Sequence, residues 1–555
     1  MTTGTPRTAA QLIVEALEQN GIERIFCVPG ESYLALLDAL YDSTIPVTVC
    51  RQEGGAAMMA EAWGKLTGKP GIVMVTRGPG ATNGSAGLHV GRQDSTPMIM
   101  FVGQVARSMR GREAFQEIDF TRMFGEVSKW ICQIDDAGRV PEIMSRAFHE
   151  ATSGRPGPVV IALPEDMLRE TTPAANAAPW TQVETHPGLN QMAQLQKMLW
   201  SAERPLVILG GSRWSEAAVA GVRRFAERFD LPIACSFRRQ MLFDHEHSNY
   251  AGDIGIGINP KLAARVREAD VLLLLGGRMS EVPSSSYALI DIPEPKQTLV
   301  HVHPGAEELG RVYRPTLAIN ASPTAFVAAL EGIQPPNEVP WAADTAVAHA
   351  DYLGWTQPLA HPGAVQLAEI MNWLNQRLPP ESVVVCGAGN YTGWVHRFTR
   401  HRRYNTQLAP TSGSMGYGMP AAVAAKLRYP DRLVVGFAGD GCFQMTSQEF
   451  ATAVQSGAAM VLIVIDNGSY GTIRMHQERD FPDRVIATEL IGPDYVAYAE
   501  AYGGFGEKVE TTDQFAPAFE RAVASGKPAL LHVRLDQEAS TASRTLSQIR
   551  GTGQP

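Results

Sequence analysis

Short apolar runs alternate with amphipathic segments along most of this chain. In the first third, five runs have the length and β-branched content of buried strands: 25–28, 47–50, 72–76, 98–102 and 159–163. A helix is expected from Thr8 to Asn20, because Thr8 and Gln11 form a capping box and Gly21 supplies a stop. Strands that alternate with helices in this way predict a doubly wound parallel sheet.

The same alternation recurs twice further along the chain. The second α/β segment has three predicted strands, at 206–209, 271–275 and 299–302. Polar stretches that contain Pro and Ala, at 171–187 and after Pro335-Pro336, are expected to be linkers. We therefore predict an α/β fold with domains at 1–170, 188–334 and 361–535, followed by a tail at 536–555.

The composition is typical of a globular protein, with 45% hydrophobic and 19% charged residues. Lys and Arg number 48 against 57 Asp and Glu, so the net charge is −9, and no basic block suggests nucleic acid or an anionic membrane as a partner. The six cysteines form no Cys-x-x-Cys pair and are expected to be reduced thiols. No signal peptide or membrane span is recognisable, so a cytoplasmic location is predicted.

Two polar motifs in the third segment each follow an apolar run. Asp440 lies in Gly-Asp-Gly, between Gly439 and Gly441, and Asn467 lies in Asp-Asn-Gly. Each motif alone is more often an ordinary turn. Consecutive strands of a right-handed βαβ unit end at the same sheet edge, however, and that edge is where ligands bind. Oxygen ligands suit Mg²⁺ and the glycines allow close approach to phosphates, so the pair predicts a magnesium–diphosphate site.

A helix is expected between these two motifs. Residues Thr446 to Glu449 read Thr-Ser-Gln-Glu, which is the pattern of a capping box. In such a box the hydroxyl and the carboxylate would each bond a backbone N–H group at the start of the helix.

Together with five other segments, these motifs resemble the thiamin-diphosphate-dependent enzymes of the acetolactate synthase large-subunit type. The other segments follow the family's order over nearly the whole chain, at 28–31, 51–56, 76–83, 114–117 and 413–418. The resemblance implies two doubly wound domains of one topology, which bind the pyrimidine and diphosphate ends of the cofactor. They would flank a central Rossmann-like α/β domain.

The resemblance also assigns residues to the cofactor and its metal. Asp440 and Asn467 would coordinate Mg²⁺ through their side chains, and Ser469 through its backbone carbonyl. Met415 matches the large apolar residue over which the cofactor bends, and the Gly413 carbonyl would accept from the 4′-amino group. The remaining cofactor contacts implied are Asn390, Gly439, Gly441, Cys442 and Tyr470.

Glu53 is the residue that the resemblance makes central to catalysis, with Gly30 in the same half of the site. The family uses a glutamate in this motif to bond N1′ of the pyrimidine, so that the 4′-imino group can take the C2 proton. A buried carboxylate can hold the raised pKa that such proton sharing requires. The alternative is an acid that favours the dipole at the start of a helix. Glu61, further along that helix, is expected to be structural.

Three residues are candidates for substrate contact. Phe115 and Gln116 match positions that line the substrate channel of acetolactate synthases, and Gln116 could bond a carboxylate or carbonyl. The alternative for Gln116 is a surface-loop amide. His476 follows the Asn-Gly loop, where the family shapes the acceptor pocket, although a lone histidine is more often a structural hydrogen-bonding group.

The chain also departs from the acetolactate synthase pattern. Glu165 replaces a lysine, His303 replaces an aspartate, and the loop that contacts flavin is replaced by 250–257. A tryptophan expected near His476 is missing. FAD in the central domain is therefore doubtful. A dinucleotide fingerprint that begins at Gly387 is not completed either, because Gly393 comes one residue too late.

The implied activity is decarboxylation of a 2-oxo acid such as pyruvate and ligation of the product to an acceptor carbonyl, with thiamin diphosphate and Mg²⁺. One alternative is a lyase that cleaves a C–C bond in an acyloin, diketone or 2-hydroxyacyl substrate. Another class is a flavin- or nucleotide-binding oxidoreductase, or a non-catalytic sensor on the same fold. The partners expected are small 2-oxo acids or aldehydes. Because the family pairs Glu53 of one subunit with Asp440 and Asn467 of another, a homodimer or homotetramer is implied.

Overall fold

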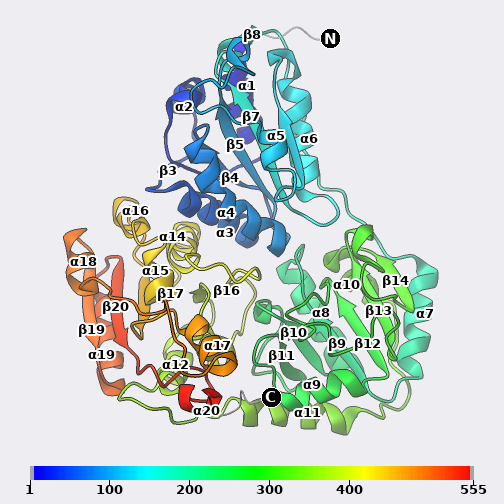
Figure 1. Cartoon of the computed structure of the whole chain (residues 1–555). Helices are drawn as coiled ribbons and strands as arrows, with labels where there is room; N and C mark the ends of the chain where they lie inside the picture. The colour runs from blue at the N-terminus through cyan, green and yellow to red at the C-terminus, as the bar shows by residue number, and fades with distance from the viewer. Residues whose placement is uncertain (1–5, 551–555) are drawn as a thin grey trace.

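The computed structural model describes residues 6–550, and its three domains each contain a six-stranded parallel sheet (Figure 1). The N-terminal sheet consists of β2 (Ile25–Cys27), β3 (Val47–Val49), β4 (Gly71–Val75), β5 (Met98–Gln104), β6 (Trp130–Gln133) and β7 (Pro158–Pro164). Its helices are α1 (Ala9–Gln19), α2 (Leu34–Tyr41), α3 (Glu53–Thr67), α4 (Pro79–Asp94), α5 (Phe120–Met123) and α6 (Val140–Thr152). A small antiparallel pair, β1 (Arg7–Thr8) and β8 (Thr171–Thr172), lies beside this domain.

The five strands predicted for this domain are present, and the Thr8–Gln11 capping box forms at the start of α1. The sixth strand, β6, was missed by the sequence pattern. It is a four-residue edge strand whose side chains are all half-buried, so it lacks the apolar run of a central strand.

The central sheet consists of β9 (Pro205–Leu209), β10 (Ile233–Ser236), β11 (Tyr250–Ile254), β12 (Val271–Leu275), β13 (Thr298–His303) and β14 (Leu317–Asn320). Its helices are α7 (Leu189–Trp200), α8 (Glu216–Phe229), α9 (Pro260–Glu268), α10 (Pro323–Leu330) and, leading onward, α11 (Ala342–Trp355). The strand order is β11-β10-β9-β12-β13-β14. Counted from the first strand, this is 3-2-1-4-5-6, the order of a dinucleotide-type Rossmann sheet. The prediction of a Rossmann-like central domain is confirmed.

The C-terminal sheet consists of β15 (Val383–Cys386), β16 (Gln407–Leu408), β17 (Val434–Gly439), β18 (Val461–Asp466), β19 (Phe505–Val509) and β20 (Ala529–Arg534). The helices are α12 (Leu367–Arg377), α13 (Thr392–Phe398), α14 (Gly418–Arg428), α15 (Asp440–Gln444), α16 (Glu449–Gln455), α17 (Gly471–Asp480), α18 (Tyr495–Ala501), α19 (Thr512–Ala524) and α20 (Leu546–Arg550). Within residues 6–550, no helix is long and apolar enough to cross a bilayer.

The first and third sheets have the same topology. Their strand orders are β3-β2-β4-β5-β7-β6 and β16-β15-β17-β18-β20-β19. Each is 2-1-3-4-6-5 when its strands are numbered along the chain, as the resemblance implied. Figure 1 shows the two domains in contact through α3 and α14, and residues of both helices belong to one shared hydrophobic cluster.

The capping box predicted at Thr446–Glu449 does not form. Helix α16 begins at Glu449, and its N-cap, Gln448, makes no side-chain cap. The Thr446 hydroxyl instead donates to the Gly416 carbonyl at 2.7 Å, and the Glu449 carboxylate bonds backbone N–H groups of the N-terminal domain. Both side chains therefore bond groups in other segments instead of the backbone at the start of α16.

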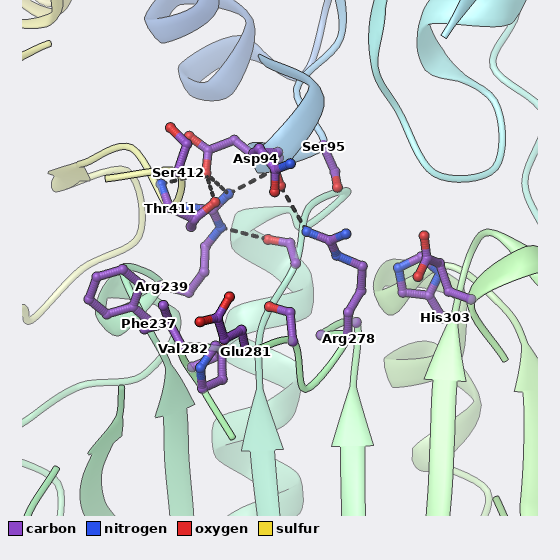
Figure 2. A pocket seen from close by; sticks show the side chains of 18 of the residues that line it. Asp94, Ser95, Phe237, Arg239, Arg278, Glu281, Val282, His303, Thr411 and Ser412 are labelled. Carbon is purple, nitrogen blue, oxygen red and sulfur yellow. Dashed lines mark hydrogen bonds and ion pairs between the residues drawn. The ribbon is translucent and has the colours of Figure 1, made fainter. Parts of the chain in front are cut away.

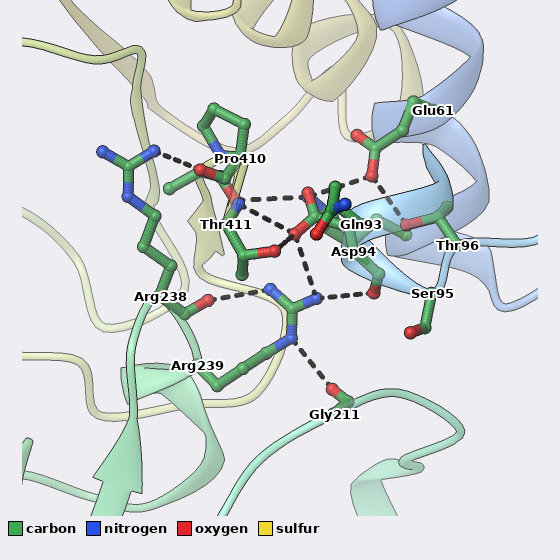
Figure 3. Close-up of polar contacts among 12 residues, drawn as sticks. Glu61, Gln93, Asp94, Ser95, Thr96, Gly211, Arg238, Arg239, Pro410 and Thr411 are labelled. Carbon is green, nitrogen blue, oxygen red and sulfur yellow. Dashed lines mark hydrogen bonds and ion pairs between the residues drawn. The ribbon is translucent and has the colours of Figure 1, made fainter. Parts of the chain in front are cut away.

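A buried polar junction connects all three domains (Figure 3). Asp94, at the end of α4, is ion-paired with Lys65 at 2.7 Å and accepts from the backbone N–H of Thr411 at 2.8 Å. Arg239 of the central domain donates to the Asp94 carbonyl at 3.1 Å and to Gly211 at 2.8 Å. Since Asp94 is 2% exposed, these partners replace water around its charge.

A neighbouring carboxylate extends the junction. Glu61 accepts from Thr96 and from the Tyr417 hydroxyl of the C-terminal domain, each at 2.6 Å, and lies 3.0 Å from Lys65. The sequence-based expectation that Glu61 is structural agrees with these bonds.

The substitution Asp94→Ala is expected to lower the free energy of unfolding by about 3 kcal/mol, because it leaves two buried cations without their shared carboxylate. The midpoint of urea denaturation, followed by circular dichroism, measures the loss. As a control, Glu331→Ala removes the exposed partner of Arg224 and should cost no more than about 0.5 kcal/mol. Equal midpoints for the two variants would contradict the importance of the junction.

Candidate active site

A cavity of about 260 Å³ lies at the carboxyl ends of β17 and β18. Asp440 directly follows β17 and Asn467 directly follows β18, and the two strands are neighbours in register. The two predicted metal ligands therefore meet in one cavity. Every predicted cofactor residue also lines it: Asn390, Gly413, Met415, Gly439, Gly441, Cys442, Ser469 and Tyr470.

The charges beside this cavity suit a divalent cation. Burial, and then the neighbouring carboxylate of Asp466, raise the pKa of Asp440 to about 6. Burial also acts to raise the pKa of Asp466, but hydrogen bonds from His532, Gly468 and Arg534 outweigh it and lower that pKa to about 2. Among residues 6–550, no cationic side chain forms an ion pair with Asp440, and a bound Mg²⁺ would stabilise its ionised form.

The turn after β18 orients the second ligand. The Asn467 amide oxygen accepts from the backbone N–H of Ser469 at 3.2 Å, and Asp466 accepts from Gly468 at 2.9 Å. Gly468 has a positive φ of 65°, which favours glycine there. The Ser469 carbonyl accepts from Gly471 at 2.8 Å and keeps a second lone pair for a cation.

The start of α15 packs closely against the turn that follows β18. A Cβ atom on Gly441 would lie 2.7 Å from the Tyr470 ring, so a side chain there is excluded. The loop that carries Met415 is held by Cys442, whose Sγ accepts from the Gly416 N–H at 3.2 Å. Cys442 therefore both lines the cavity and fixes the position of the residue over which the cofactor is expected to bend.

Residues beyond β20 also reach the cavity. Ser540 lies 3.3 Å from Asn390 and, with Leu535 and Ala539, contributes to the lining. Helix α20 is anchored because Arg550 donates to the buried Glu478 of α17 at 2.7 Å. The sequence pattern did not identify these lining residues, since a Ser-, Thr- and Gln-rich segment shows no apolar periodicity.

The catalytic candidates of the N-terminal domain lie apart from this cavity. Glu53 is the first residue of α3, is 8% exposed and accepts from the Asn83 amide at 3.0 Å. Gly30 is packed against Thr76, where a Cβ atom would approach within 2.4 Å. Among residues 6–550 of one chain, every residue that lines the cavity belongs to the C-terminal part, so Glu53 does not reach it.

The substrate-channel candidates are dispersed in the single chain. Phe115 is 71% exposed, and the neighbouring Gln116 has a positive φ of 64° and packs against Gly78. His476 is exposed on α17, whereas Ile473, on the same helix, lines the cavity. Their roles in substrate binding stay predictions.

A second cavity, of about 490 Å³, lies at the carboxyl ends of the central strands β9, β12 and β13 (Figure 2). Ligands of open α/β sheets bind at this edge. Arg239 belongs to its wall, and its three guanidinium nitrogens bond the carbonyls of Gly211, Arg238 and Asp94. Arg278 donates to the Gln93 carbonyl at 2.9 Å, and no carboxylate in the described part of the chain forms an ion pair with it.

The residues at the strand ends decide whether this cavity suits a flavin dinucleotide. The acetolactate synthase pattern has an aspartate at the position that ends β13. The residue there is His303, which is buried and whose Nδ1 atom lies 3.0 Å from both the backbone nitrogen and the carbonyl oxygen of Gly305. Burial lowers the pKa of His303 to about 3, so the ring is neutral. This strand end therefore offers no carboxylate to a ribose.

Comparison with known proteins places these features in one family. Models of the thiamine pyrophosphate enzymes match the N-terminal TPP binding domain at residues 7–123, the central domain at 192–330 and the C-terminal TPP binding domain at 387–533. The acetolactate synthase isozyme 2 large subunit of Escherichia coli is 30% identical over 95% of each chain. The acetolactate synthase large subunit of Lactococcus lactis is 29% identical over 96% of this chain and 93% of its own.

The fold and the matches over nearly the whole length define an enzyme that uses thiamin diphosphate. The chain belongs to the thiamine pyrophosphate enzyme family, among relatives of the acetolactate synthase large-subunit type. The predictions of a thiamin-diphosphate-dependent enzyme and of a carboligase acting on a 2-oxo acid are confirmed.

The substitution Asp440→Ala is expected to weaken binding of thiamin diphosphate with Mg²⁺ by about 100-fold or more, because the cavity loses its carboxylate ligand. Isothermal titration calorimetry measures the change. The thermal midpoint of the cofactor-free protein should not fall, since a buried charge without a cationic partner is removed. The exposed Asp480→Ala serves as the control, and retention of wild-type affinity in Asp440→Ala would contradict the assignment.

Proposed function

We propose that this enzyme decarboxylates a 2-oxo acid such as pyruvate and ligates the remaining acyl unit to an acceptor carbonyl, with thiamin diphosphate and Mg²⁺. The observation that carries the proposal is the convergence of Asp440, Asn467, Gly413 and Met415 on one cavity at the edge of the C-terminal sheet. The cofactor would supply the nucleophilic carbon that attacks the substrate carbonyl. The relatives described as acetolactate synthases support this activity over cleavage of an acyloin or diketone.

We propose a role for each of the main site residues. Asp440, Asn467 and the Ser469 carbonyl would hold Mg²⁺ against the diphosphate, and Met415 would hold the cofactor in its bent form. The Glu53 carboxylate would share a proton with N1′ of the pyrimidine. Glu53 is buried, and among the described residues its carboxylate has one side-chain hydrogen bond, from Asn83, so an oxygen is left to bond the pyrimidine.

We further propose that the working unit is a homodimer or homotetramer. The support is the separation of Glu53 from a cavity that the C-terminal residues of the same chain line by themselves. A second copy that presents its own Glu53 would complete each site, and a two-fold arrangement completes both sites at once. A cytoplasmic location stays a prediction from the sequence.

A panel of 2-oxo acids and aldehydes, incubated with the purified protein, thiamin diphosphate and Mg²⁺, tests the activity. Mass spectrometry should find CO₂ release from a 2-oxo acid together with a new hydroxy-ketone product. If no donor gives either CO₂ or a hydroxy-ketone product, the proposed activity is wrong. Because the residue at the end of β13 does not suit a ribose, the same preparation should show no flavin absorbance, and a yellow band would revive the oxidoreductase alternative.

The substitution Glu53→Gln should lower turnover by about 100-fold or more, since an amide cannot exchange the proton. Co-assembly of Glu53→Gln chains with Asp440→Ala chains provides the sharper readout. About half of randomly assembled dimers are mixed, and each has one intact site if sites span two copies, so about a quarter of wild-type activity should return. No recovery on mixing would mean that each site is formed within one chain.

A further inference from the structure

The carboxylate of Glu449 is fully buried at the contact between the N-terminal and C-terminal domains. Its Oε1 atom accepts from the backbone N–H groups of Gln52 at 2.9 Å and Arg51 at 3.1 Å. Its Oε2 atom accepts from the Thr452 hydroxyl at 2.6 Å. All of these partners except Thr452 belong to the other domain, and none corresponds to the capping box that the local sequence predicts.

The two amides that Glu449 binds lead directly into Glu53. Gln52 is the N-cap of α3 and Glu53 is its first residue. The first N–H groups of a helix have no partner within the helix, and a carboxylate at this end is favoured by the helix dipole. The direction in which the Glu53 side chain leaves the helix therefore depends on backbone that Glu449 holds.

The absence of a side chain at Gly55 leaves room for the Glu449 carboxylate. A Cβ atom on Gly55 would lie 2.6 Å from Glu449 Oε1, so a side chain at that position would displace the carboxylate. Burial raises the pKa of Glu449, while its hydrogen bonds from Thr452, Arg51 and Gln52 act in the opposite direction. These hydrogen-bond donors thus offset the free-energy cost of burying the Glu449 carboxylate.

We propose that Glu449 is a positioning residue for Glu53: it fixes the start of α3 so that the Glu53 carboxylate meets the pyrimidine of the cofactor. The proposal rests on the catalytic role of Glu53 given above. It also links two half-sites, because Asp440 begins α15 and Glu449 begins α16 in the same stretch of chain. Through Glu449, the metal-binding segment of one chain supports the catalytic acid that the same chain presents to its partner's cofactor.

Hydrogen bonding rather than charge is the property required of Glu449. In Glu449→Gln the amide oxygen can accept from both backbone N–H groups, and the Thr452 hydroxyl can rotate to accept from the amide nitrogen. In Glu449→Asp the carboxylate is withdrawn by one methylene, and in Glu449→Ala both backbone groups lose their partner. A displacement of about 1 Å at a catalytic group can cost about 100-fold in rate.

The first measurement uses the cofactor-free protein. Hydrogen–deuterium exchange of the peptide that covers residues 49–55 should lose protection in Glu449→Ala and Glu449→Asp and keep it in Glu449→Gln. The second measurement is the rate of exchange of the C2 proton of bound thiamin diphosphate, followed by NMR. This rate should fall about 100-fold in Glu449→Ala, remain low in Glu449→Asp and return to within about threefold of wild type in Glu449→Gln.

Two further variants separate positioning from general stability. Gly55→Ala should slow C2 exchange although alanine favours a helix, because it displaces the Glu449 carboxylate. Thr452→Val removes the hydroxyl donor but leaves both backbone bonds, so it should lower the thermal midpoint while C2 exchange stays within about twofold of wild type. If Glu449→Ala does not fold, Glu449→Asp and Gly55→Ala carry the test.

Different results would overturn different conclusions. Slow exchange in Glu53→Gln combined with wild-type exchange in Glu449→Ala and Glu449→Asp would overturn the positioning role alone. Equally slow exchange in Glu449→Gln and Glu449→Ala, or in Thr452→Val and Glu449→Ala, would also overturn it. Wild-type exchange in Glu53→Gln would remove the catalytic role of Glu53, and the positioning role with it.

Discussion

Buried carboxylates that accept hydrogen bonds across domain boundaries are the interactions on which this structure depends. Asp94, Glu61 and Glu449 each lie out of water and each bond groups from a different domain. An unpaired charge in such a place would cost several kcal/mol, so these contacts form only when the domains have one relative position. These hydrogen bonds therefore fix the position of the N-terminal domain relative to the C-terminal domain.

The same junction supports the cavity that we propose for the cofactor. Asp94 holds Thr411, Lys65 bonds the Ala409 carbonyl at 3.2 Å, and Arg238 bonds Pro410. This short segment leads into the loop that carries Gly413 and Met415. Residues far from the cavity therefore determine where the loop stands, and Cys442 fixes its other end through Gly416.

The central domain combines a nucleotide-type topology with altered chemistry at the strand ends. Its strand order suits a dinucleotide, yet His303 occupies the place of an acid, and each guanidinium nitrogen of Arg239 bonds a backbone carbonyl. Fold and ligand are separate properties here, because topology places a cavity at the sheet edge while individual side chains decide what it accepts.

Much of the fold could be predicted from the sequence because central strands of parallel sheets are continuous apolar runs. The runs before Asp440 and Asn467 placed both residues at strand ends, and their neighbouring parallel strands brought them together. The edge strand β6 was missed because half-buried side chains carry a weak pattern. The sequence did not predict that Ser540 lines the cavity, because its segment shows no periodic pattern of apolar residues.

The sequence by itself determined the α/β class, the three-domain order and the cofactor family, and it predicted a half-site around Asp440, since each depends on local patterns or on matching motifs. Only the tertiary structure decided the partners of buried polar groups. Thr446 and Glu449 have the local pattern of a capping box, yet both bond other segments, because burial against another domain offered donors and acceptors that the helix start could not match. The separation of Glu53 from the cavity likewise depends on how whole domains pack, which short motifs do not encode.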